Sequence, residues 1–109
     1  MPRSENKMIS LNRVIVAGKL VKGVEAGKEE NGKSYAILEI AVDEPMENHA
    51  TKLEIVVKGS LAENCKKYLE KGSNIMAEGR ITSDRMDING QSVDMVKGLA
   101  SSVVFVSKQ

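Results

Sequence analysis

Apolar residues recur at every second position along most of this chain, and a single helical period interrupts that pattern. Alternation with a period of two is typical of β-strands that bury one face. Three such stretches precede the interruption and two follow it: 11–21, 34–43, 51–58, 74–83 and 93–106. Between them, an apolar stripe with helical spacing consists of Leu61, Cys65, Tyr68 and Leu69. The sequence therefore predicts three strands, one helix and two strands, in that order.

Both ends of the predicted helix carry sequence signals. Ser60 followed three residues later by Glu63 is the pattern of a capping box, and Gly72 has the place of a left-handed residue that ends a helix. We expect Tyr68 in the core because it lies on the helix stripe. Phe105 is expected there because it lies in the last apolar cluster, VVFV.

Glycines and asparagines predict how the strands are connected and bent. The Asn-Gly pairs at 31–32 and 89–90 favour tight hairpins. Gly18, Gly79 and Gly98 lie inside strand patterns, where glycine indicates a bulge or bend. Such bends let a short sheet curl until its edges meet, and a helix can close one end. We predict an all-β fold with one helix: a five-stranded OB-fold Greek-key barrel with the helix between strands three and four.

Length and charge restrict the possible functions. The chain has 109 residues, and we divide it into a flexible arm at 1–10 and an OB-fold domain at 11–109. With 16 Lys and Arg against 15 Asp and Glu, the net charge is +1, so any attraction to a polyanion must be local. One cysteine, Cys65, and one histidine, His49, cannot form a closed zinc site, and we expect neither metal nor cofactor. No stretch is long and apolar enough to span a membrane, and we expect a cytoplasmic protein.

Residues 27–34, GKEENGKS, match the spacing of a phosphate-binding loop. That loop needs a helix directly after it, so that helix amides hold the phosphates. The next ten residues have period two instead, and we interpret the segment as a hairpin. No serine has a nucleophile-elbow pattern and the carboxylates are scattered, so we expect no enzyme activity.

Several stretches resemble the bacterial single-stranded DNA-binding protein family: LNRVIVAGKL, NGKSYAILEIAVDEP and GSLAENCKKYLEKGSNIMAEGRI. The resemblance covers almost the whole chain. It implies a homo-oligomer, more often a tetramer than a dimer, that wraps single-stranded DNA over the outer wall of the barrel without reading sequence. It implies no cofactor.

The chain departs from this family at its DNA-facing positions. Where members usually carry aromatic residues that stack on bases, this sequence has Lys52, Lys58 and Met86. Each stacked base is worth about 1–3 kcal/mol, so binding through lysines should be weaker and strongly dependent on salt. The printed sequence ends at SSVVFVSKQ, without the acidic tail by which members recruit replication and repair enzymes. We therefore expect an accessory paralogue, for which partners of that kind are possible but not recruited by a tail.

The candidate nucleic-acid-binding residues combine cations with the few side chains able to contact bases. Tyr35 is expected to point outward as a stacking platform, and the thioether of Met86 and the side chain of Ile37 are further base contacts. The full set is Lys33, Tyr35, Lys52, Lys58, Arg80, Arg85, Met86 and Lys97. From composition alone, these cations are more simply interpreted as an ordinary solvated strand face, and the family resemblance favours the phosphate track.

These observations predict sequence-independent binding of single-stranded DNA in replication, repair or recombination. Two alternatives remain open on the same barrel. One is a dimeric primosomal replication protein that mainly bridges other proteins, and the other is a protein-binding module without affinity for DNA.

Overall fold

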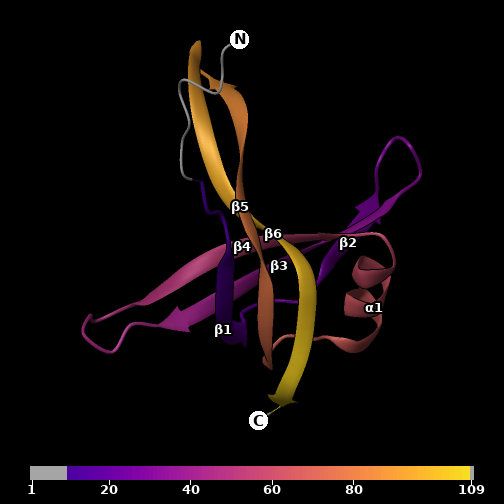
Figure 1. The fold of residues 1–109 in the computed structure, drawn as a ribbon, viewed down its shortest axis with the longest axis vertical. Coiled ribbons are helices and arrows are strands. Elements are labelled where there is room, and N and C mark those ends of the chain that lie inside the picture. The colour runs from indigo at the N-terminus through magenta and orange to yellow at the C-terminus, as the bar shows by residue number, and fades with distance from the viewer. Residues whose placement is uncertain (1–9, 109) are drawn as a thin grey trace.

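The computed structural model describes residues 10–108, which form one curled sheet and a helix (Figure 1). The predicted arm at 1–10 lies almost wholly outside the described residues. The strands are β1 (Val14–Leu20), β2 (Glu25–Lys28), β3 (Ser34–Asp43), β4 (Ala50–Lys58), β5 (Ser73–Ile88) and β6 (Gln91–Lys108), and α1 (Ser60–Tyr68) lies between β4 and β5. The predicted order is confirmed, and the pattern over 34–43 matches β3 at both ends.

The sheet closes on itself. Its strands follow the order β1-β5-β6-β4-β3-β2, with β6 parallel to β4 where Gly98 pairs with Ile55. An antiparallel contact between Lys19 and Ala41 joins β1 to β3 and completes the ring. This is the predicted OB-fold barrel. It has six strands instead of five, because Glu25–Lys28, which the sequence pattern left unassigned, pair with β3 as the short strand β2.

The core lies where the alternating patterns placed it. Inward-facing residues of four strands and two residues of α1 are almost inaccessible to solvent: Leu20, Leu38, Ile40, Val57, Ile75, Ala62 and Cys65. Their neighbours along each strand face outward, as a pleated strand requires. The outer wall that carries Lys52 and Lys58 is therefore positioned by the burial of the other β4 face.

Two core predictions are wrong. Tyr68 is 58% exposed, because the buried side of α1 is centred on Ala62 and Cys65, and Tyr68 lies at its edge. The Nζ of Lys67 lies 5.4 Å from the Tyr68 ring centroid, a cation–π contact at the surface. Phe105 is 45% exposed, because β6 extends beyond the last residue that packs on the core, Val103.

The predicted helix caps also differ. Gly59, with φ of 72°, is the N-cap and has no side-chain cap, so Ser60 is the first helical residue and forms no capping box. The Glu63 carboxylate instead accepts a hydrogen bond from Ser34 Oγ at 2.8 Å. Gly72 has the predicted positive φ, 95°, but it follows the helix end at Tyr68 by four residues. Its amide donates to the Leu20 carbonyl and so ties the loop to β1.

Residues 27–34 form a hairpin, as predicted. β2 and β3 flank the turn, in which the Gly32 amide donates to the Glu29 carbonyl at 2.8 Å. Strand β3, and not a helix, begins at Ser34. The helix that a phosphate-binding loop requires is therefore replaced by a strand.

The hairpin between β5 and β6 is longer than predicted. Asn89 and Gly90 both have positive φ, as a two-residue turn requires, and pairing continues without a break from Ile88 opposite Gln91 into the barrel. Residues 82–97 project from the barrel as a two-stranded ribbon (Figure 1). From here on, the arm means this ribbon of β5 and β6 and not the predicted N-terminal arm at 1–10. The radius of gyration, 16.2 Å, is correspondingly larger than the value of about 13 Å typical of a rounded domain this long.

Candidate nucleic-acid interface

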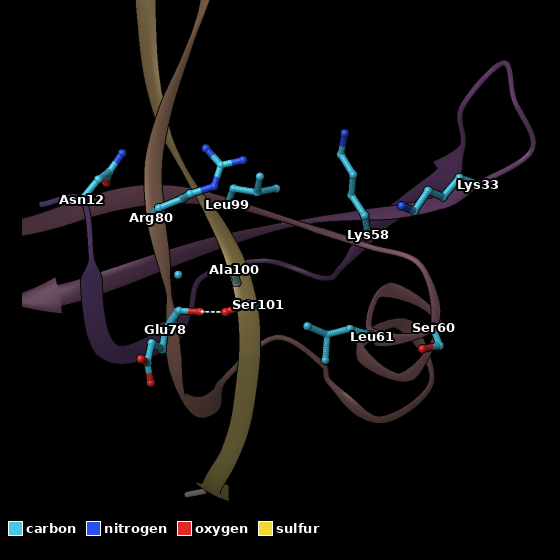
Figure 2. Close-up of a pocket in the computed structure, with 11 residues that line it drawn as sticks. Asn12, Lys33, Lys58, Ser60, Leu61, Glu78, Arg80, Leu99, Ala100 and Ser101 are labelled. Atoms are coloured by element: carbon cyan, nitrogen blue, oxygen red, sulfur yellow. Dashed lines mark hydrogen bonds between the residues drawn. The ribbon is translucent and has the colours of Figure 1, made fainter. Parts of the chain in front are cut away.

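A basic groove of about 530 Å³ lies on the outer wall between the root of the arm and the start of α1. Figure 2 shows Lys33 and Lys58 on one side of this groove and Arg80 on the other. Strand register explains part of the arrangement, since Val56 of β4 pairs with Leu99 of β6, which pairs with Arg80 of β5. The closed ring therefore brings together three of the predicted cations. The groove is lined by Asn12, Lys33, Lys58, Ser60, Leu61, Glu78, Gly79, Arg80, Leu99, Ala100 and Ser101.

Two of these three cations have no ion-pair partner in the part of the chain that the structure describes. Among residues 10–108, no carboxylate forms an ion pair with Lys33 or Arg80. Lys58 is paired with Glu29 at 2.9 Å, at the turn that precedes β3. An exposed pair of this kind is worth at most about 1 kcal/mol, so a phosphate can compete for the lysine.

Two further features add positive potential to the basic groove. Ser60 and Leu61 begin α1 and line the groove, so the positive end of the helix dipole faces it. The groove's one carboxylate, Glu78, is engaged by Arg13. The basic groove is therefore suited to hold phosphate groups.

A second concavity, the methionine groove of about 480 Å³, lies between β4 and the arm. It contains Lys52, Met86 and Lys97 of the predicted set, and Met95 beside them. Met86 and Met95 are each close to half exposed, at 49% and 46%. Three carboxylates also line it, so its charge is mixed, and its apolar side chains are the two polarizable methionines together with Leu53 and Val96. Its lining is Glu39, Lys52, Leu53, Glu54, Asp84, Met86, Met95, Val96 and Lys97.

The cations of the methionine groove differ in their availability. Lys97 is paired with Asp84. Lys52 forms no ion pair with any residue of the described chain, and it is exposed on the outer face of β4. Outside the lining, Lys22 Nζ is shared by Glu25 at 3.2 Å and the groove residue Glu39 at 3.5 Å. Its hydrogen bond to Glu25, and then the charge of that carboxylate, raise the Lys22 pKa.

The structure places Tyr35 and Arg85 apart from both grooves. Tyr35 is half-buried and packs over Gly27, where an added Cβ would lie only 2.8 Å from the Tyr35 hydroxyl. Its ring lines a smaller pocket of about 270 Å³ beside Glu63 of α1. Arg85 is paired with Asp94 at 3.2 Å, on the face of the arm opposite Met86.

Asn12 and Met95 are among the groove residues that the sequence analysis did not predict. Met95 could have been found from the 89–90 hairpin, because a two-residue turn places Met95 opposite Asp84 and on the same face as Met86. Asn12 carries no such signal, because its contact with Ile81 depends on the closed barrel.

Three further findings concern residues outside the grooves. Burial raises the pKa of the Cys65 thiol to about 11. Within the described part of the chain, no three His, Cys, Asp or Glu residues are grouped closely enough to hold a metal ion. The helix found there, α1, is too short to cross a bilayer.

A closed barrel with this strand order, carrying a basic groove and a methionine groove on one outer wall, defines a binding protein of the OB-fold class. A family model matches residues 11–106, and it is that of the single-strand binding protein family. The chain belongs to this family.

Individual relatives agree with the family model. The chain is 35% identical over 102 residues to a single-stranded DNA-binding protein of Halalkalibacterium halodurans, a match that covers 88% of this chain and 61% of the relative. It is 33% identical over 102 residues to single-stranded DNA-binding protein 2 of Staphylococcus aureus, covering 88% and 72%. A single-stranded DNA-binding protein of Fusobacterium nucleatum is 28% identical over 102 residues, covering 87% and 66%. This chain thus spans less than two thirds of the length of the first of these relatives.

Proposed function

We propose that this protein binds single-stranded DNA without reading its sequence and without catalysing a reaction. The observation that carries the proposal is the meeting of Lys33, Lys58 and Arg80 around one groove on the outer wall of an OB-fold barrel. The names of its relatives support the choice of ligand. Phosphates lie in the basic groove, and bases lie over Met86 and Met95 in the methionine groove.

The charge distribution assigns phosphates and bases to these two grooves. The basic groove has three cations and one carboxylate already engaged by Arg13, whereas the methionine groove has more carboxylates than cations. A polyphosphate backbone is attracted to the first and repelled by the second. Lys52 supplies a further phosphate contact at the rim. Tyr35 and Arg85 contribute less because they lie outside both grooves, and Lys97 contributes less because it lies with Asp84 in the methionine groove, whose carboxylates repel the backbone.

A titration with labelled oligo(dT) over a series of salt concentrations tests the proposal. Each phosphate contact on a single strand contributes about −0.7 to the slope of log K against log salt. We therefore expect a slope of about −2 from the three groove cations and about −3 with Lys52. Absence of binding at low salt would eliminate the function and favour a protein-binding barrel.

Matched substitutions locate the site. Arg80→Ala and Lys33→Ala should each weaken binding and reduce the slope by about 0.7. Arg85→Ala removes an arginine paired with Asp94, and Lys19→Ala removes an exposed lysine from β1, outside both grooves. Equal effects of the groove variants and their controls would contradict the assignment of phosphates to the basic groove.

We further propose that the protein acts as a homo-oligomer, a tetramer in preference to a dimer, in DNA replication, repair or recombination in the cytoplasm. The outer face of β1, β5 and β6 exposes a row of apolar side chains, with Ile15 at 54%, Met76 at 40% and Val104 at 48%. Apolar surface of this kind favours burial against another protein surface. Light scattering at several concentrations measures the assembly directly, and a monomer at all of them would refute it.

A further inference from the structure

The side chain of Asn12 takes the place of a backbone ladder pair at the root of the arm. The last ladder pair between β1 and β5 joins Val14 to Gly79, so the same register continued would place Asn12 opposite Ile81. The chain leaves the sheet there, and the Asn12 side chain makes both bonds. Its Nδ2 donates to the Ile81 carbonyl at 2.7 Å, and its Oδ1 accepts from the Ile81 amide at 2.8 Å.

This contact holds the arm at a place where few other attachments exist. The residues of the arm pair with one another across the ribbon. Within the described chain, β5 pairs with β1 only up to Gly79, and β6 pairs with β4 only from Gly98 onward. On the β6 side, the root is held by the parallel pairs of Gly98 and Leu99 with β4. On the β5 side, the ladder with β1 ends at Gly79, and the Asn12 contact extends it by two residues to Ile81. Among residues 10–20, Asn12 therefore makes the contact with β5 that lies nearest to the arm.

Arg80 lies between the two anchored positions of β5. Its neighbours are Gly79, paired with Val14, and Ile81, bonded to Asn12. No ion pair with a described residue holds the Arg80 guanidinium, so the backbone alone determines which way this side chain leaves the strand. Figure 2 shows Asn12 and the Arg80 side chain on either side of β5, and both residues line the basic groove.

We propose that Asn12 is a positioning residue for DNA binding, which fixes the backbone on either side of Arg80 and so directs the guanidinium into the basic groove. The proposal rests on the proposed function. It predicts that Asn12 contributes to affinity through Arg80, and that it need not touch DNA itself. Its loss should free the β5 backbone at Ile81 and lower the fraction of time in which Arg80 faces a phosphate.

A double-mutant cycle tests this route of action. Oligo(dT) affinity and its salt slope are measured for the wild-type protein, Asn12→Ala, Arg80→Ala and the double variant. We expect Asn12→Ala to weaken binding several-fold at low salt and to reduce the slope by up to about 0.7. In the Arg80→Ala background the same substitution should have almost no further effect, because the two residues act as a unit. Asn64→Ala, which truncates an exposed asparagine of α1, is the matched control and should leave the slope unchanged.

Two supporting measurements separate positioning from general stability. Hydrogen exchange at the Ile81 amide should become faster in Asn12→Ala, because that amide loses its acceptor. The melting temperature should change little, since Asn12 is exposed and lies outside the core. Additive losses in the cycle, or unchanged affinity despite faster exchange at Ile81, would overturn the role of Asn12. Absence of binding by the wild-type protein would overturn the proposed function instead.

Discussion

Replacing Gly79 with alanine should force β5 and β6 apart at the bend next to the root of the arm. Gly79 directly follows a register shift between Glu78 and Gly79, and its missing side chain lets β6 pass close by. A methyl group built there would overlap the Leu99 carbonyl oxygen and lie 2.7 Å from the Ala100 Cα. Both neighbours are backbone, which cannot rotate away as a flexible side chain can.

The size of the effect follows from this overlap. Ordinary contact begins at 3.4 Å, so β6 would have to move by at least about 0.7 Å from the methyl group, and further at the Leu99 oxygen. Overpacking of a well-packed interior costs about 1–3 kcal/mol, and the upper end applies here because a ladder must shift. We therefore expect Gly79→Ala to lower the free energy of unfolding by about 3 kcal/mol, and the melting temperature by about 12–24 °C for a domain of this size.

Thermal unfolding followed by circular dichroism measures this change. All variants are compared at one protein concentration, because association would shift the apparent stability. Gly23→Ala is the control: no atom lies within 4 Å of the added methyl group, and φ there is not positive. That variant should be neutral or more stable by about 0.4–1 kcal/mol. If Gly79→Ala melted within about 3 °C of the wild-type protein, the steric account of this bend would be refuted, since so small a shift corresponds to less than 1 kcal/mol.

Three further predictions concern charge, protonation and base contact. Glu29→Gln removes the carboxylate that competes with phosphate for Lys58, and should tighten oligo(dT) binding by up to about 1 kcal/mol with the salt slope unchanged; unchanged affinity would show that phosphate does not displace this ion pair. Burial raises the pKa of the Cys65 thiol from 9.0 to about 11, so the unfolded chain loses this proton first and stability falls as pH rises between those values. Denaturant titrations over that pH range should show a fall in the free energy of unfolding of the wild-type protein that Cys65→Ser lacks. The same dependence on pH in both proteins would refute this role of the thiol. Met86→Trp places a stacking ring in the methionine groove and should tighten binding by about 1–3 kcal/mol, whereas Met46→Trp, on the distant β3–β4 turn, should not.

The fold could be predicted because its determinants are local in sequence. Alternation over 34–43 encodes both the strand and the face it buries, and the Asn-Gly pair at 89–90 encodes the turn that joins β5 to β6. Features that depend on distant partners were predicted less well. Tyr68 satisfies the helical spacing, but the barrel end covers only the side of α1 centred on Ala62 and Cys65. The helical period predicts which residues form an apolar stripe, but the surface of the barrel against which the helix packs determines which of them are buried.

Strand register determines which of the predicted cations are paired with a carboxylate and which are available to bind phosphate. Each lysine or arginine on an outward face has the same appearance in the sequence, yet Arg85 has Asp94 directly across the ladder, whereas Arg80 has Leu99. The first pair follows from the 89–90 turn and could have been deduced. Arg80 meets Lys33 only because β4 and β6 run parallel and β1 closes on β3, contacts between segments far apart in the chain. A near-neutral chain can therefore present a basic groove, because register pairs some cations with carboxylates and leaves others free to meet phosphate.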